Sequence, residues 1–132
     1  MSRNRTYRVL VADEHTYLWR VKHCHDEGCD ETLTIRRVAS PSGRALHFRP
    51  KQGYVIPDGG MSATGVIGDD ADRQLNLNEP GVVRAFIDAL TAAEWPATDR
   101  RFLHLDGWPW LDAAYRHSSV DSHPATSRFE PQ

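Results

Sequence analysis

The sequence predicts an α+β fold. An antiparallel meander of four to five strands is covered on one face by a helix from the C-terminal half, and a short final helix follows. Three observations lead to this prediction. The first fifty residues alternate apolar and polar side chains with the period of two that strands have. Turn-forming residues separate these runs. Residues 79–95 instead repeat apolar side chains at the spacing of an amphipathic helix.

Four strands are expected in the N-terminal half, over residues 6–12, 16–23, 32–38 and 44–50. Apolar residues of neighbouring strands should share one face, and a slip of one residue would move every side chain to the other face. The first hairpin therefore pairs Val11 with Tyr17 and leaves a three-residue loop at residues 13–15.

The same reasoning fixes the next two hairpins. Pairing Trp19 with Ile35 leaves a loop at residues 26–28, where Gly28 suits a left-handed backbone position. The Ser-Pro-Ser-Gly turn at residues 40–43 then sets Ile35 opposite Phe48.

Strand signals weaken after residue 50. Residues 54–57 indicate a short fifth strand, and a Gly- and Asp-rich loop follows, with a brief strand at residues 65–68. The helix of residues 79–95 has Asn78 as its expected N-cap, with Leu77 and Val82 in the positions of a hydrophobic staple. Its apolar stripe consists of Val83, Phe86, Ile87 and Leu90, and an Arg84–Asp88 pair lies on its other side.

A last short strand is expected at residues 101–105. Asp106 then caps a helix that runs to about His117, with Trp108, Leu111 and Tyr115 on one face. Residues 1–117 therefore form a single α+β domain, and the polar residues 118–132 are expected to be a disordered tail.

Composition narrows the class of protein. The chain of 132 residues has no apolar run long enough to cross a bilayer, and its two cysteines cannot form a disulfide framework. With no secretory signal at its N-terminus, we expect a cytoplasmic protein with reduced thiols and no membrane association. Residues 1–52 carry a net charge of +4 and residues 53–132 a net charge of −6, which sum to the total of −2. This asymmetry indicates either a basic surface for a partner or two halves that complement each other.

The stretch KHCHDEGCDE at residues 22–31 contains both cysteines and two histidines. In the expected register, His23 faces Glu31 and His25 faces Cys29, all on one face, whereas Cys24 points to the other side with Asp30. A Cys24–Cys29 disulfide is therefore disfavoured. His23, His25 and Cys29 could bind zinc, with Glu31 or water as the fourth ligand. The alternatives are an ordinary solvated hairpin end, with no cofactor, and a redox-sensing thiol.

A basic stripe is expected on the sheet face away from the core, made of Arg8, Arg20, Lys22 and Arg36. Arg20, Lys22 and Arg36 are candidates for contacting a protein partner, as is Trp110 on the last helix, because Trp is common at binding hot spots. Nucleic acid is an unlikely partner, because Tyr7, Tyr17 and Trp19 are assigned to the core face and no stacking platform remains.

Catalytic signals are weak, and the chain is not expected to be an enzyme. It has no G-x-S-x-G elbow and no Lys-Ser/Thr pair behind its glycines. His104 and Asp106 share a face at the end of a strand and form either an acid–base pair or a structural hydrogen bond. If the chain is an enzyme, its site should lie under the loop of residues 57–78.

The pieces YLWRVKH, Pro80 through Trp95, and Phe102 to Leu105 resemble those of small uncharacterised bacterial α+β proteins. These proteins have a strand-rich N-terminal half followed by a helix, a Trp and a short strand. The resemblance implies the α+β fold and carries no functional residue to this chain. By elimination, the sequence favours a non-catalytic protein-interaction or accessory module. A zinc- or thiol-dependent module is the alternative, and a small enzyme is third.

Overall fold

The computed structural model describes residues 7–24, 30–56, 65–69 and 73–122, and within them it has the predicted α+β fold. Five strands form the main sheet in the order β1-β2-β3-β4-β8. Their bounds are β1 Arg8–Ala12, β2 His15–Cys24, β3 Asp30–Arg37, β4 Gly43–Phe48 and β8 Phe102–Asp106. The first four strands form the predicted antiparallel meander, and β8 adds a parallel edge beside β4.

The register between β2 and β3 is the predicted one. Trp19 pairs with Ile35, Val21 with Leu33, and His23 with Glu31. Trp19, Ile35 and Leu33 are buried on the face that meets the helices. The predicted loop at residues 26–28 lies outside the described residues.

The register between β1 and β2 differs from the prediction by one residue. Leu10, and not Val11, pairs with Tyr17, and the strands are joined by Asp13 and Glu14 alone. Asp13 has a φ of 58°, a left-handed conformation that Asp tolerates in a tight turn. Consequently Val9 and Val11 face outward with 66% and 63% of their surface exposed.

The register between β3 and β4 also differs, by four residues. Ile35 pairs with Arg44, and Phe48 pairs with Glu31. The turn begins earlier than predicted, and the Arg37 N–H donates to the Ser42 carbonyl at 3.1 Å. An even slip keeps each side chain on its face, so Leu46 and Phe48 still enter the core, but Arg44 enters with them.

A second, three-stranded sheet occupies the region predicted as a fifth strand and a loop. It consists of β5 Tyr54–Val55, β6 Val66–Asp69 and β7 Gln74–Asn76. The brief strand predicted at residues 65–68 corresponds to β6, whereas the sequence did not indicate β7. The expected fifth strand pairs with β6 and does not extend the meander.

Helix α1 runs over Pro80–Ala93 and buries the predicted stripe of Val83, Phe86, Ile87 and Leu90. The N-cap is Glu79 and not Asn78, and it makes no side-chain capping bond. The Leu77 N–H donates to the Gly65 carbonyl at 2.7 Å, so the approach to the helix is held by the residue that precedes β6 and not by a side-chain cap. The Arg84–Asp88 pair forms as predicted, at 3.0 Å.

Helix α2 runs over Trp108–Ser122, so it extends beyond the expected end near His117 and takes in the first residues of the expected tail. The Trp108 N–H donates to Asp106 Oδ1 at 3.3 Å, in the predicted capping position. Trp108 and Leu111 are buried as expected, and Tyr115 is partly buried against the core. Residues 123–132, the rest of the predicted disordered tail, lie outside the described residues.

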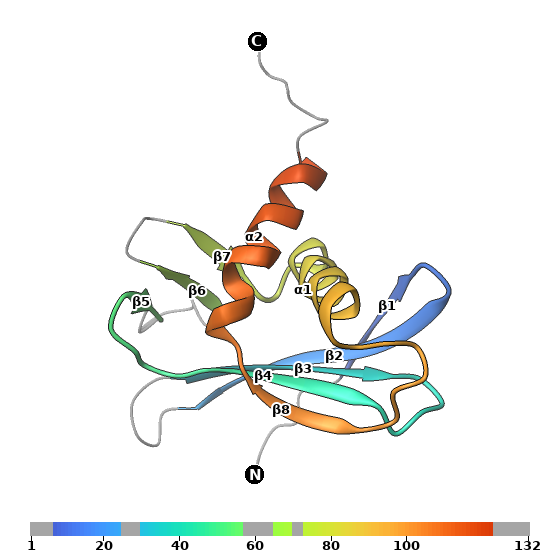
Figure 1. Cartoon of the computed structure of the whole chain (residues 1–132). Coiled ribbons are helices and arrows are strands. Elements are labelled where there is room, and N and C mark those ends of the chain that lie inside the picture. The colour runs from blue at the N-terminus through green and yellow to red at the C-terminus, as the bar shows by residue number, and fades with distance from the viewer. Residues whose placement is uncertain (1–6, 25–29, 57–64, 70–72, 123–132) are drawn as a thin grey trace.

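All the covering elements lie on one side of the main sheet (Figure 1), where α1, α2 and the small sheet enclose the core. The opposite face of the main sheet carries no helix or strand within the described ranges (Figure 1). Among the same residues, no helix is both long and apolar enough to span a membrane.

Candidate functional site

The uncovered face of the main sheet, which we call the outer face, is defined by the strand registers. Residues paired across strands point to the same side. One row crosses the sheet from Val9 through Leu18, Arg36 and Gly43 to Phe102. The helices α1 and α2 cover one side of the sheet (Figure 1), where the alternate residues Trp19 and Ile35 are buried, so this row faces away from both helices.

Three of the predicted partner-binding residues lie on the outer face. Arg36 belongs to the row just described, and Arg20 and Lys22 occupy the next alternate positions of β2. Lys22 and Arg36 are exposed and Arg20 is half-buried.

Arg8, predicted in the same stripe, lies on the core face instead. It pairs with Trp19, holds its guanidinium 4.4 Å from the Trp19 ring and donates to the Asn78 carbonyl at 3.1 Å. The slip in the β1–β2 register is the reason, because it reverses the face of every β1 side chain.

Beside these cations the outer face exposes a group of apolar side chains, which we call the valine patch: Val9, Val11 and Val38. Val38 is 46% exposed and its N–H donates to the Thr16 carbonyl at 3.0 Å. Val11 of β1 pairs with Thr16 from the other side, so Thr16 lies between Val11 and Val38, the residue that follows β3. Their apolar surface therefore lies next to Arg36 on an open sheet.

Two aromatic rings also lie on the outer face. The Arg20 guanidinium is 4.7 Å from the centre of the Tyr7 ring, and the Arg36 guanidinium is 5.1 Å from that of Phe102. The alternation of side chains predicted Tyr7 on the core face. The β1 slip corrects this as well, and each ring carries a cation–π contact with one of the candidate arginines.

Trp110 is not part of the outer face. It lies on α2, which covers the other face of the sheet (Figure 1), and it is partly buried against the core. The structure therefore brings Arg20, Lys22 and Arg36 together and separates Trp110 from them.

At the hairpin, His23 and Glu31 are in direct contact through His23 Nδ1 and Glu31 Oε2. Glu31 is fully buried and also accepts the Gly65 N–H at 3.0 Å. The expectation of a solvated hairpin end is therefore wrong for these two residues. The other two predicted zinc ligands, His25 and Cys29, lie outside the described residues. The part of the chain that is described contains no group of three or more potential ligand side chains.

A pair of histidines that the sequence did not predict lies on the outer face. His47 Nε2 and His104 Nδ1 are 2.9 Å apart, and Thr32 Oγ1 lies 3.3 Å from His47 Nδ1. Burial lowers the pKa of His47, and the nearby Arg49 and His104 lower it further against the opposing charge of Asp30. His104 thus bonds to a histidine, while Asp106 caps α2, so the two do not form an acid–base pair with each other.

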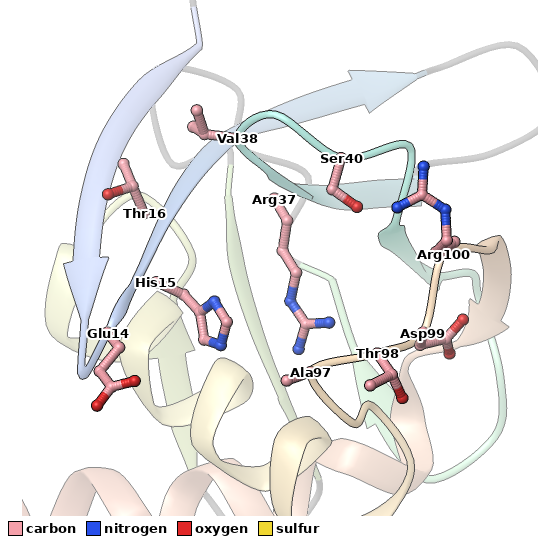
Figure 2. Close-up of a pocket in the computed structure, with 10 residues that line it drawn as sticks. All are labelled: Glu14, His15, Thr16, Arg37, Val38, Ser40, Ala97, Thr98, Asp99 and Arg100. Carbon is pink, nitrogen blue, oxygen red and sulfur yellow. The ribbon is translucent and has the colours of Figure 1, made fainter.

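An open pocket of about 400 Å³ lies between the start of β2, the turn after β3 and the loop of residues 97–100 (Figure 2). His15, Arg37, Ser40 and Arg100 are among its lining residues. None of them was a candidate from the sequence. The one available signal was that Arg37 follows Ile35 by two positions and so shares its core-facing side.

The site expected under residues 57–78 can be placed only in part. β6 and β7 belong to this segment, whereas residues 57–64 and 70–72 lie outside the described ranges. Gly65 reaches Glu31, so the described part of the segment packs against the hairpin end of the main sheet.

Comparison of the chain with protein-family models, with curated proteins and with solved structures gives no match.

Proposed function

We propose that this chain is a small, non-catalytic interaction module of the cytoplasm that binds an acidic, partly apolar segment of another protein on its outer face. One observation carries the proposal: the valine patch lies uncovered beside Arg36 on a sheet face with no described element over it. Exposed apolar side chains next to charged ones are typical of protein interaction sites. The two cysteines, too few for a disulfide framework, favour the cytoplasmic placement.

Charge determines which partner fits this face. Arg20, Lys22 and Arg36 supply three cations on neighbouring strands. Acidic side chains on the partner would complement them, and the adjacent valines would bury apolar residues of the same segment. Complementary charge of this kind mainly speeds association and selects the partner, whereas burial of the apolar residues supplies the affinity.

The experiment is a peptide-display selection followed by binding measurements on variants. We expect the selected peptides to combine Asp or Glu with apolar residues and to bind more weakly as the salt concentration rises. Arg36→Glu and Val11→Ser should each weaken binding about tenfold or more, since each removes a central contact. Arg116→Glu on α2 is the matched control and should leave binding unchanged.

Two results would refute this function. One is a selection that returns no peptide, or only peptides whose binding survives both substitutions on the outer face. The other is tight binding of single-stranded oligonucleotides that is lost with Arg36→Glu. In that case Tyr7 and Phe102 would be stacking residues and the face would bind nucleic acid instead.

A second candidate function is zinc binding at the β2–β3 hairpin, and the contact between His23 and Glu31 favours it. Histidine nitrogen and carboxylate oxygen are both zinc ligands, and His25 and Cys29 would complete the set. Native mass spectrometry after zinc addition should show one zinc per chain, lost with His23→Ala or Cys29→Ala and retained with His104→Ala. A metal-free spectrum of the unmodified chain under the same conditions contradicts this candidate.

A further inference from the structure

The two buried arginines of the main sheet have different surroundings. Arg44 is fully buried and meets two carboxylates: its Nε donates to Glu94 at 2.7 Å and its Nη2 contacts Asp99. Arg37 is 6% exposed and forms no ion pair with any acidic residue of the described ranges. Its Nη1 and Nη2 donate to the carbonyls of Pro96 at 2.7 Å and Trp95 at 3.0 Å.

The remaining contacts of Arg37 do not neutralise its charge. The guanidinium lies 4.2 Å from the centre of the Trp95 ring and 5.9 Å from that of Tyr17. Its Nε is buried and makes no hydrogen bond with the described residues. A guanidinium stays protonated in proteins, and a buried charge that lacks a counter-ion is costly. Two carbonyls and two rings compensate this cost only in part.

Arg37 lines the pocket, although its Nε is itself buried. Figure 2 shows the guanidinium in the middle of the pocket with the His15 ring beside it. Ser40 and Arg100 on the rim add a hydroxyl group and a second cation.

Acidic residues do not already fill this role. Glu14 and Asp99 also line the pocket, and Glu14 is exposed. Asp99 accepts hydrogen bonds from Arg44 and, at 3.1 Å, from Arg101 Nε, so its negative charge is balanced by these two arginines and not by Arg37. In Figure 2 its carboxylate points away from Arg37.

We propose that this pocket binds a small oxyanion ligand, a molecule with a carboxylate or phosphate group, with Arg37 as the residue that contacts the anion. Nη1 and Nη2 each carry a second N–H beside the one donated to a backbone carbonyl, and these can donate to the oxygens of one such group. The bonds to Trp95 and Pro96 hold the guanidinium in place before the ligand arrives, which reduces the entropy lost on binding. A volume of about 400 Å³ suits a small metabolite and not a macromolecular segment.

The ligand site is distinct from the proposed partner site, although the two are close. Val38 lines the pocket with its neighbour Arg37 and also belongs to the valine patch on the outer face. The anion is expected to bind whether or not a protein partner does, so either proposal can fail without the other.

The test is an NMR titration of the full chain with inorganic phosphate, acetate and succinate in separate arms, at constant ionic strength set with sodium chloride. We expect a saturable shift of the Arg37 Nε–H resonance and of the His15 ring signals in at least one arm. The arm with the tightest saturation distinguishes a phosphate ligand from a carboxylate or dicarboxylate one. Resonances of the outer-face residues Arg20 and Lys22 should not move.

Variants locate the contact. Arg37→Gln should weaken binding about tenfold or more, because it removes a charge-assisted pair of hydrogen bonds. Arg116→Gln, which removes an exposed arginine from α2, should leave the titration unchanged. If Arg37→Gln does not fold, the unmodified chain still decides. A linear drift of the Arg37 Nε–H signal in all three arms, equal to that with chloride alone, would overturn the proposal.

Discussion

At the scale of single residues, the most informative side chain is Arg44. Sequence alternation places it on the core face with Leu46 and Phe48, where a cation is rare. Its five N–H donors are shared among the carboxylates of Glu94 and Asp99 and the backbone carbonyls of Gly43 and Arg101, at 2.7 and 3.0 Å for the latter two. A buried charge of this kind is tolerated because every donor finds an acceptor.

Asp99 makes the acid stability of this arrangement predictable. Hydrogen bonds from the Arg101 side chain and backbone, and then from Arg44, hold the Asp99 pKa well below its ordinary value. The unfolded chain therefore takes up this proton first on acidification. The ionised Asp99 carboxylate contributes fully to the free energy of unfolding above the ordinary Asp pKa of about 3.9. This contribution is lost as the pH falls towards the depressed pKa of the folded state.

We predict that Asp99→Asn lowers the urea midpoint of unfolding at pH 7 and that the gap to the unmodified chain narrows steadily below about pH 4. The variant should retain some acid sensitivity, because the pKa of Asp112 is also lowered, chiefly by its hydrogen bond from Arg73. The measurement is a series of urea titrations across this pH range. A gap of constant size at all pH values would contradict the assigned role of Asp99.

At the scale of elements, the junction between β4 and β8 depends on Gly43. A Cβ at this position would lie 2.6 Å from Phe102 Cδ2 and 2.9 Å from the Ile35 carbonyl oxygen. The first neighbour is a ring that can move, but the second is backbone of the adjacent strand. The parallel edge strand can therefore approach β4 and lay its ring across it only where the side chain is a hydrogen atom.

We predict that Gly43→Ala lowers the free energy of unfolding by roughly 1–3 kcal/mol, the usual cost of overpacking a well-packed contact. Gly81→Ala is the matched control, since a Cβ there meets nothing within 4 Å and the residue lies in α1. It should be neutral or stabilising by about 0.5–1 kcal/mol. Equal effects of the two substitutions, measured by urea denaturation, would show that the close approach at Gly43 is unimportant.

The same scale shows which parts of the fold the sequence could predict. The β2–β3 register was predictable because periodicity and a glycine-containing loop agreed. The β1–β2 register was not, because residues 9–12 are all apolar and either face looks suitable for the core. A tight turn with Asp13 in a left-handed conformation decided it. The β3–β4 slip was hidden because it is even and leaves the buried pattern of Leu46 and Phe48 unchanged.

The candidate sites likewise include some residues whose position the sequence predicted and others that it did not. The position of Arg20, Lys22 and Arg36 on the outer face was predictable because they alternate with buried residues on one strand pair. The Arg37 pocket and the His47–His104 pair were not. Both depend on segments that return from more than fifty residues downstream, the loop of residues 97–100 and the parallel strand β8. Periodicity describes a strand and its neighbours along the chain, but it does not identify a partner that arrives through a crossover.

At the scale of the whole molecule, the architecture is one-sided, because two helices and a small sheet cover one face of the main sheet and leave the other open (Figure 1). The charge asymmetry of the sequence follows this division in part. Arg44 from the basic half is neutralised by Glu94 and Asp99 from the acidic half. This is the charge complementarity between the two halves that the sequence indicated as one alternative. Arg20, Lys22 and Arg36 remain on the open side, where a partner can reach them.

The pairing of Arg44 with carboxylates 50 and 55 positions later also sets an order of events during synthesis. The meander leaves the ribosome first, but its fourth strand carries a cation that must stay hydrated until those carboxylates emerge. In a nascent chain halted before residue 99, Arg44 would therefore stay hydrated, and the end of the sheet around it would not be packed. The sheet can close only after the loop that follows α1 has left the ribosome.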